Sequence, residues 1–274
     1  MAVARPVTAV VRDVRSGELL VVARVAPDGM ERSVDAMARI QPLSAVKLAI
    51  GALWLEHHDD AKAFHCLGSR ELESTADVLV DGCDGAGKEL AIRLRRDDGA
   101  PKILTELSRL GLAPDAGESS ASDSAWAGAF SVGETGVRTT LLDLSSLMQV
   151  IGNDGVRSQR SRIDSATSGG AQRVMSVRTA RSLQRALRRC VQEGTAKAIK
   201  DSLRETGWEL GGKTGTGPGF DRPNSAGLFV SLLFDRDHRA RYAIAIRTLG
   251  AGPGGGAAAQ ATVGIARILL PRAP

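Results

Sequence analysis

Residues 42–55 of this chain read PLSAVKLAIGALWL, and this stretch decides how the rest of the sequence is interpreted. From Ser44 to Leu55 it is apolar on nearly all sides and rich in Ala and Leu, which predicts a buried helix. Residues three apart lie one above the other on a helix, so Lys47 is expected beside the Ser44 hydroxyl. Burial lowers the pKa of a lysine, and a neutral lysine can take the proton of a serine nucleophile. Taken alone, the spacing favours a helix-capping serine and a lysine that reaches solvent.

A second motif, Lys213-Thr214-Gly215-Thr216, follows two glycines much later in the chain. Its lysine offers a cation for a substrate carboxylate, and its two threonines offer hydroxyl groups. Gly215 lets a substrate backbone come close because it carries no side chain. The alternative is a glycine-rich turn before a strand. The pairing with Ser-x-x-Lys upstream makes that alternative the weaker one, because the two motifs occur together in serine enzymes that react with β-lactams.

The hydrophobic periodicity predicts strands at both ends of the chain and helices between them. A hairpin is predicted from Val7 to Val14 and from Leu19 to Val25, with a glycine in its turn. The other predicted elements are helices at 76–95 (broken by the glycines at 82, 85 and 87), 102–110, 141–151, 177–191 and 257–270, and strands at 228–234 and 242–247. Residues 113–131 are rich in Ser, Gly, Ala and Asp, which predicts a surface loop. This order predicts one α+β domain whose sheet joins the two termini.

The composition argues against several functions. The 274 residues are 43% hydrophobic and 24% charged, as in ordinary globular proteins. No apolar run approaches the ~18 residues that a membrane helix needs. The formal net charge is +5, and arginines concentrate at 178–189, but no aromatic residues for base stacking are interleaved there. We therefore expect a solvated helix face and no nucleic-acid partner.

The three cysteines and four histidines show no metal-binding spacing, so we expect neither metal nor cofactor. An odd number of cysteines leaves at least one free thiol.

With these motifs the chain resembles the transpeptidase domain of penicillin-binding proteins over nearly its whole length. Pro42 to Lys47 resembles the nucleophile motif, and Gly194-Thr195-Ala196 resembles the segment before the Lys-Thr-Gly motif. The turn at 13–18, the helix from 139 that ends at Asn153-Asp154-Gly155, and the strand at 226–230 fit the same domain. The resemblance implies an α+β fold of the β-lactamase-like superfamily, with a five-stranded antiparallel sheet, flanking helices and a helical subdomain. It implies one domain over 1–274, with the sheet subdomain at 1–40 and 205–274 and the helical subdomain at about 41–204.

The resemblance also implies a role for each matched residue. Ser44 would be the acyl-forming nucleophile and Lys47 its base. The backbone N–H groups of Ser44 and Thr216 would form the oxyanion hole. The residues that would bind the terminal carboxylate of a D-Ala-D-Ala stem peptide or a β-lactam are Lys213, Thr214 and Gly215. Peptidoglycan stem peptides and β-lactams are thus the expected ligands, and other cell-wall synthesis proteins the expected partners.

The chain departs from the family at its middle motif, which is normally Ser-x-Asn. The aligned residues are Gly82 and Asp84, and both are expected in the substrate-binding site. Gly82 lacks the hydroxyl that would relay a proton, and an ionised Asp84 can only accept hydrogen bonds where an asparagine amide would donate. General acid–base catalysis contributes ~10²–10⁴-fold to a rate, so this change bears on activity. Cys83, between them, has two interpretations, a reactive thiol or a small buried packing residue, and we expect the second.

Three functions stay open at this stage. The first, which we expect, is an active serine D,D-transpeptidase or D,D-carboxypeptidase. The second is a catalytically weakened module that binds peptidoglycan stems or a partner protein. The third is a β-lactamase-like hydrolase, which needs a deacylating group; Glu118 and Glu134 have no recognisable context for that role. The family works on the outer side of the cytoplasmic membrane, so we expect a cell-envelope location, with membrane contact only through a segment absent from this chain.

Overall fold

The main sheet of the protein has five antiparallel strands in the order β2-β1-β11-β10-β9. The computed structural model describes residues 6–25, 36–58, 60, 63–66, 71–115, 123–158, 170–217, 226–249 and 254–270. The sheet strands are β1 (Val7–Asp13), β2 (Leu19–Val25), β9 (Glu209–Thr216), β10 (Ala226–Phe234) and β11 (Ala240–Leu249). β1 pairs with β11, from Val7 opposite Thr248 to Asp13 opposite Tyr242. The two ends of the chain therefore meet in one sheet, and the predicted α+β fold is confirmed.

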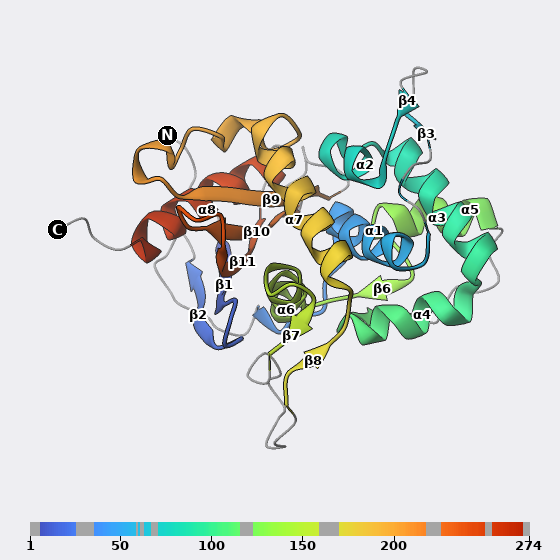
Figure 1. Cartoon of the computed structure of the whole chain (residues 1–274), viewed down its shortest axis with the longest axis horizontal. Coiled ribbons are helices and arrows are strands. Elements are labelled where there is room, and N and C mark those ends of the chain that lie inside the picture. Colours follow the sequence, from blue (N-terminus) through green and yellow to red (C-terminus); the bar gives the residue numbers. More distant parts are fainter. Residues whose placement is uncertain are drawn as a thin grey trace.

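Besides the main sheet, the described residues contain eight α-helices and three short strand pairs (Figure 1). The helices are α1 (Val46–His57), α2 (Thr75–Asp81), α3 (Asp84–Asp98), α4 (Ala100–Arg109), α5 (Asp123–Ser131), α6 (Leu141–Gly152), α7 (Val177–Gln192) and α8 (Gly254–Leu269). The strand pairs are β3 (Phe64–His65) with β4 (Glu71–Leu72), β5 (Ala113–Pro114) with β6 (Val137–Arg138), and β7 (Val156–Arg157) with β8 (Gln172–Arg173).

The sheet is apolar on both faces, because successive side chains of a strand point to opposite sides and both sets are hydrophobic. On one face, Val10 and Val230 belong to a large core that includes residues of α6, α7 and the helices α1–α5. On the other face, Val11 and Phe229 pack against α8 in a second, smaller core. Figure 1 shows the sheet between α8 on one side and α6 and α7 on the other, with α1–α5 grouped beyond α7. The edge strand β9, which carries Lys-Thr-Gly, therefore borders the helical part of the molecule.

Two parts of the structure differ from the sequence-based expectation. The predicted loop at 113–131 contains helix α5, which buries Trp126 and Phe130, so the prediction was wrong over 123–131. The predicted helix at 76–95 is broken only at residues 82–83, because Gly85 and Gly87 both lie inside α3. In each case tertiary packing outweighs an unfavourable local composition. The irregular segments expected at 26–41 and 157–170 lie mostly outside the described residues.

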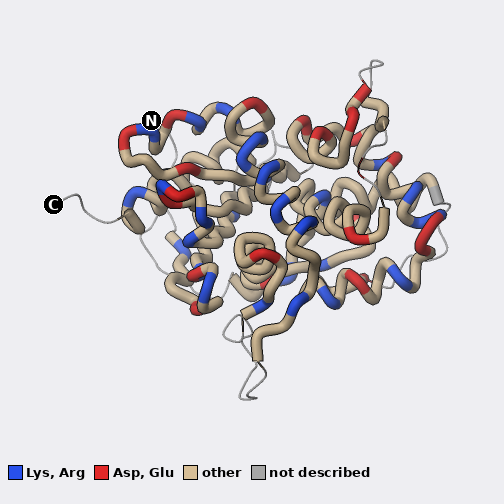
Figure 2. Tube along the Cα trace, viewed as in Figure 1, with Lys and Arg blue, Asp and Glu red and all other residues tan. Residues whose placement is uncertain are grey.

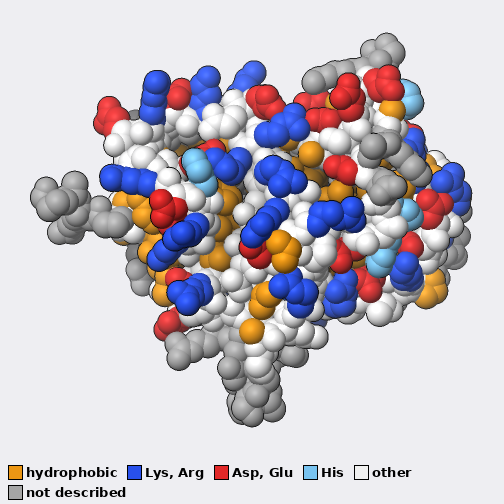
Figure 3. All heavy atoms as spheres, viewed as in Figure 1, with side chains coloured by type: hydrophobic (Ala, Val, Ile, Leu, Met, Phe, Trp, Pro, Cys, Tyr) orange, Lys and Arg blue, Asp and Glu red, His pale blue; other side chains and the backbone are white. Residues whose placement is uncertain are grey.

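The arginine-rich helix α7 has the solvated face that its sequence predicts. Arg178, Arg181, Arg185 and Arg189 are exposed, and basic side chains are spread over this face of the molecule (Figure 3). Ion pairs join Arg189 to Asp77 and Glu193, and Arg188 to Glu209. Among the described residues, none of the helices has the length and apolar character that a membrane crossing requires.

Candidate active site

Ser44 lies in a 3₁₀ turn, Leu43–Ala45, that leads directly into α1. The residue before it, Leu43, has a φ of +51°, a left-handed conformation that costs a non-glycine residue about 1 kcal/mol. Gly133 holds this turn in place: a Cβ on Gly133 would lie 2.5 Å from the backbone N and O of Leu43. Tight packing thus supports a strained backbone immediately before the predicted nucleophile.

Lys47 lies one helical turn after Ser44 and is 1% exposed. Its Nζ lies 3.2 Å from Ser44 Oγ and 3.4 Å from the carbonyl oxygen of Gly82. It also donates a hydrogen bond of 2.5 Å to Asp84 Oδ1. Burial lowers the pKa of Lys47, while the Asp84 carboxylate acts in the opposite direction without outweighing burial. The ammonium is therefore poised to lose its proton more readily than an exposed lysine, but less readily than it would beside a neutral residue 84.

The middle motif connects two helices. α2 ends at Gly82, which has a left-handed φ of +66°, and α3 begins at Asp84, whose side chain is 66% exposed. Between them, Cys83 forms a disulfide with Cys66 in the segment of β3. The expectation of a simple packing residue at 83 was therefore wrong. The third cysteine, Cys190, is a buried free thiol, as the odd count predicted.

The Lys-Thr-Gly motif lies on β9 and faces the other two motifs. Lys213 is 1% exposed, and a Cβ on Gly82 would lie 3.2 Å from its Nζ. Burial, reinforced by the charge of Lys47, lowers the pKa of Lys213 to about 8. The Thr214 hydroxyl donates to Thr195 Oγ1 at 2.8 Å. Since the ammonium of Lys213 is enclosed, a substrate carboxylate would meet the threonine side chains first and feel Lys213 mainly through its charge.

The remaining residues of β9 fix the backbone beside Ser44. A Cβ on Gly215 would lie 3.0 Å from Leu43 Cβ and 3.5 Å from Ser44 N. The missing side chain thus admits the turn that carries Ser44, whereas the sequence suggested that it admits a substrate. Gly217 N donates to Ala226 O on β10 at 2.8 Å. N–H groups alternate in direction along a strand, so the N–H of exposed Thr216 points away from β10 on this edge strand.

The structure brings Ser44, Lys47, Gly82, Asp84 and Lys213 together from three separate segments. It also adds three residues that the sequence analysis did not assign to the site. A Cβ on Gly87 would lie 2.7 Å from Lys47 Cε, so this glycine makes room for the lysine. Thr195 accepts a hydrogen bond from Thr214, and its methyl group would lie 3.1 Å from a Cβ on Gly82. Cys66 holds the middle motif. In the sequence, the unusual position of Gly87 inside a predicted helix was the signal for a close contact. Only the fold shows that the contact is with Lys47.

In the described part of the chain, neither Glu134 nor His58 forms a hydrogen bond or ion pair with Ser44, Lys47 or Lys213. Glu134 is exposed, and Glu118 lies outside the described residues. His58 stacks on Trp54 with ring centroids 4.1 Å apart. Within the described ranges, no group of His, Cys, Asp and Glu is placed to hold a metal ion.

Comparison with known proteins identifies the family. Residues 92–267 match the family model described as the penicillin-binding protein transpeptidase domain. No curated protein sequence matches the chain. Among solved structures, the transpeptidase domain of penicillin-binding protein 3 from Burkholderia pseudomallei is similar at 19% identity and a TM-score of 0.69, covering 98% of this chain and 90% of that one. The transpeptidase domain of FtsI4 D,D-transpeptidase from Legionella pneumophila is similar at 18% identity and a TM-score of 0.68, covering 97% and 90%.

Penicillin-binding protein 3 from Mycobacterium tuberculosis, complexed with aztreonam, is similar at 21% identity and a TM-score of 0.66, covering 98% of this chain and 74% of that one. At these identities the structural likeness speaks for the fold alone. The family-model match covers more than half of the chain, and it agrees with the fold. The chain belongs to the penicillin-binding protein transpeptidase domain family, whose members act in peptidoglycan crosslinking.

Proposed function

We propose that this domain is a penicillin-binding serine acyltransferase whose acylation step is slowed by an acidic residue in the middle motif. The observation that carries the proposal is the row of three groups Ser44 Oγ, Lys47 Nζ and Asp84 Oδ1, joined by contacts of 3.2 and 2.5 Å. The first contact fits a serine nucleophile with a lysine base. The second contact stabilises the ammonium form of Lys47, which cannot act as a base.

In the proposed reaction, neutral Lys47 takes the Ser44 proton as Oγ attacks the carbonyl carbon of a D-Ala-D-Ala stem peptide or a β-lactam. The Oγ–C bond forms, the C–N bond breaks, and the proton passes from Lys47 to the leaving nitrogen. The backbone N–H groups of Ser44 and Thr216 stabilise the oxyanion of the intermediate. Thr214 and Thr216 receive the substrate carboxylate, with the charge of Lys213 behind them. An amine of a second stem peptide, or water, then releases the acyl group.

The middle motif limits this chemistry in two ways. Asp84 favours the ammonium form of Lys47, which cannot accept a proton. Residue 82 supplies only its carbonyl oxygen, 3.4 Å from Lys47 Nζ, so no side-chain hydroxyl from this position carries a proton to the leaving group. Acylation is therefore expected to be slow, while the groups that bind the carboxylate and the oxyanion stay in place.

Labelling with a fluorescent penicillin, followed by intact-protein mass spectrometry, tests this proposal. We expect one adduct that forms slowly in the wild type and is absent in Ser44→Ala. Ser231→Ala is the matched control and should keep the adduct, because it removes another buried serine hydroxyl, on the face of the sheet that packs against α8. An adduct that persists in Ser44→Ala would refute the assignment. Loss of the adduct within minutes would instead indicate the hydrolase.

A second candidate is a binding module without turnover, favoured by the same contact between Asp84 and Lys47. It predicts that wild type and Ser44→Ala bind a D-Ala-D-Ala peptide with equal affinity and that neither is acylated by penicillin over hours. Thr214→Val should weaken such binding, because it removes a hydroxyl beside the proposed carboxylate position.

We also propose that the domain works on the outer side of the cytoplasmic membrane, at the peptidoglycan. The disulfide Cys66–Cys83 supports this location, because disulfides persist in oxidising compartments and are rare in the cytosol. Alkylation of the protein from unreduced cells should modify Cys190 alone, and only after unfolding. Alkylation of all three cysteines would contradict the proposed location.

A further inference from the structure

An arginine occupies a core position of strand β1. The residues two before and two after it on the same face, Val10 and Val14, belong to the large core between the sheet and the helices. Arg12 points to this same side, since side chains alternate along a strand, and it is 1% exposed. Arginine stays protonated even in such surroundings, so a full positive charge is buried here.

The charge of Arg12 has polar contacts but no carboxylate partner. Its Nε donates to Ser145 Oγ at 2.8 Å and its Nη1 donates to the carbonyl oxygen of Gly17 at 3.1 Å. No ion pair joins it to any Asp or Glu of the described residues. Burial lowers the pKa of Arg12, and the charge of Asp143 acts in the opposite direction without outweighing burial. One oxygen of Asp143 already accepts from the N–H and hydroxyl of Thr140. A buried charge without a counterion is costly, so an anion from outside the chain would stabilise this arrangement.

Arg12 lies at the inner wall of a pocket of about 680 Å³ near the start of α6. Four more arginines line it, and the only acidic residue among its described lining is Asp143. These arginines are Arg39, Arg109, Arg138 and Arg157. In Figure 2, Lys and Arg positions gather where α4, β7 and β8 approach one another below α6. Arg157 Nη2 donates to the carbonyl oxygen of Arg109 at 2.9 Å, so the basic groups are held close together.

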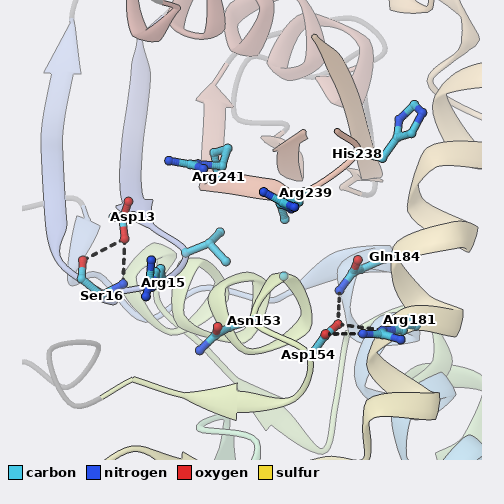
Figure 4. Close-up of a pocket in the computed structure, with 13 residues that line it drawn as sticks. Asp13, Arg15, Ser16, Asn153, Asp154, Arg181, Gln184, His238, Arg239 and Arg241 are labelled. Carbon is cyan, nitrogen blue, oxygen red and sulfur yellow. Dashed lines mark hydrogen bonds and ion pairs between the residues drawn. The ribbon is translucent and has the colours of Figure 1, made fainter. Parts of the chain in front are cut away.

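A second arginine-lined hollow, of about 870 Å³ at the other end of α6, provides a comparison (Figure 4). There Arg181 forms an ion pair of 2.9 Å with Asp154. Arg239 and Arg241 lie 3.6 and 3.5 Å from Asp237 and Asp235. Each of these three cations has its own carboxylate, as Arg109 and Arg138 of the Arg12 pocket have in Glu106 and Asp115. The pocket at Arg12 differs because its most buried cation has none.

We propose that the pocket lined by Arg12, Arg39, Arg109, Arg138 and Arg157 binds a phosphate-bearing ligand. The planar guanidinium groups match the oxygens of a phosphate with paired hydrogen bonds, which is the strongest anion contact that arginine makes. A diphosphate group offers these arginines more oxygens and more negative charge than a single carboxylate does. This site is separate from the Ser44 residues and does not depend on the function proposed for them.

Isothermal titration with inorganic pyrophosphate at low salt tests the proposal on the purified protein. We expect saturable binding of one pyrophosphate per chain. Arg39→Gln and Arg138→Gln, which change the outer arginines, should each weaken it about tenfold, because each removes a charge-assisted contact. Arg241→Gln, in the second hollow, is the matched control and should bind as the wild type does. No saturable binding at millimolar pyrophosphate, or equal weakening by the control, overturns the proposal.

Arg12→Met provides a second readout. In the wild type, pyrophosphate should raise the melting temperature. In Arg12→Met, the protein should melt at a higher temperature than the ligand-free wild type and should no longer respond to pyrophosphate. A purely structural role for Arg12 gives the opposite pattern, with lower stability and an unchanged response. If Arg12→Met does not fold, the two outer variants still decide the question.

Vesicles identify the source of the phosphate. Sedimentation with phosphatidylglycerol vesicles, lost in Arg39→Gln and competed by pyrophosphate, indicates a lipid headgroup. Pyrophosphate binding without vesicle binding indicates a soluble phosphorylated ligand. Phosphatidylcholine vesicles serve as the uncharged comparison, and failure to bind pyrophosphate and anionic vesicles alike overturns the inference.

Discussion

Replacing Asp84 by asparagine should speed acylation of Ser44, because it removes the charge that holds Lys47 in its ammonium form. Lys47 Nζ and Asp84 Oδ1 are 2.5 Å apart, and the Asp84 side chain is 66% exposed. Two unit charges at that distance interact by about 1.7 kcal/mol in a water-like dielectric. Screening around the exposed carboxylate reduces the effect to about 1 kcal/mol. The pKa of Lys47 should fall by somewhat less than one unit, which corresponds to about fivefold more neutral lysine below its pKa.

The assay is the second-order rate of acylation by a fluorescent penicillin, measured from neutral to alkaline pH for the wild type and Asp84→Asn. Below the pKa of Lys47 the variant should be about fivefold faster. The ratio should shrink as pH rises, because Lys47 then loses its proton in both proteins. Any gain that persists at high pH measures a different effect, the hydrogen bond that an asparagine amide donates to the substrate.

Asp97→Asn is the matched control for this measurement. Asp97 lies near the other end of the same helix α3 and pairs with Arg96, so its loss changes the net charge by the same amount away from Lys47. It should leave the pH profile unchanged. Equal rates for the wild type and Asp84→Asn at all pH values, or a profile displaced to higher pH in Asp84→Asn, would refute the reasoning about Lys47.

Three further predictions follow from contacts around the site. Gly87→Ala places a Cβ 2.7 Å from Lys47 Cε, so it should lower the acylation rate about tenfold through misplacement of the base, while circular dichroism shows an intact fold. Cys66→Ser or Cys83→Ser removes a link across 17 residues and should lower the free energy of unfolding by about 3 kcal/mol in urea titrations; an unchanged denaturation midpoint would contradict this. The pKa of Lys213 is about 8 in the folded protein, and its ordinary value is 10.5. Between these pH values the unfolded chain keeps a proton on Lys213 that the folded protein has lost, so the stability of the wild type should rise with pH in this range. Lys213→Met should be more stable than the wild type by up to about 3 kcal/mol below pH 8, and this difference should vanish by about pH 10.5.

The features that sequence predicted best are those set by local pattern. The hairpin of β1 and β2 follows from two valine-rich runs on either side of a glycine turn, and α7 follows from apolar residues at helical spacing. The Ser-x-x-Lys spacing likewise fixes Lys47 beside Ser44, because one helical turn sets the distance. Helix α5 was missed because its stability comes from Trp126 and Phe130, which pack into the distant core and outweigh a loop-like composition.

The parts of the site that sequence could not predict depend on contacts between distant segments. The pairing of Cys66 with Cys83 and the space that Gly87 leaves for Lys47 exist only once α1, α3 and β3 are packed. A single glycine or cysteine in a sequence does not state which residue it will face. Alignment to the Ser-x-Asn motif nevertheless predicted that residue 84 lies near Lys47, and Asp84 does contact Lys47.

The geometry of the middle motif also indicates which of its two altered positions could be restored. Gly82 has a φ of +66°, and a Cβ there would lie 3.1 Å from Thr195 Cγ2 and 3.2 Å from Lys213 Nζ. A serine at 82 therefore carries backbone strain of about 1 kcal/mol and crowds Lys213. Asp84 begins α3 with a largely exposed side chain, which an asparagine of the same shape can replace without strain. The backbone that carries the motif is held by the disulfide and by the end of α2, so the change at 84 is chemical and should be reversible. Gly82→Ser should lower the melting temperature whether or not Asp84→Asn accompanies it. If the double variant were as stable as Asp84→Asn alone, the left-handed conformation at Gly82 would not be the constraint inferred here.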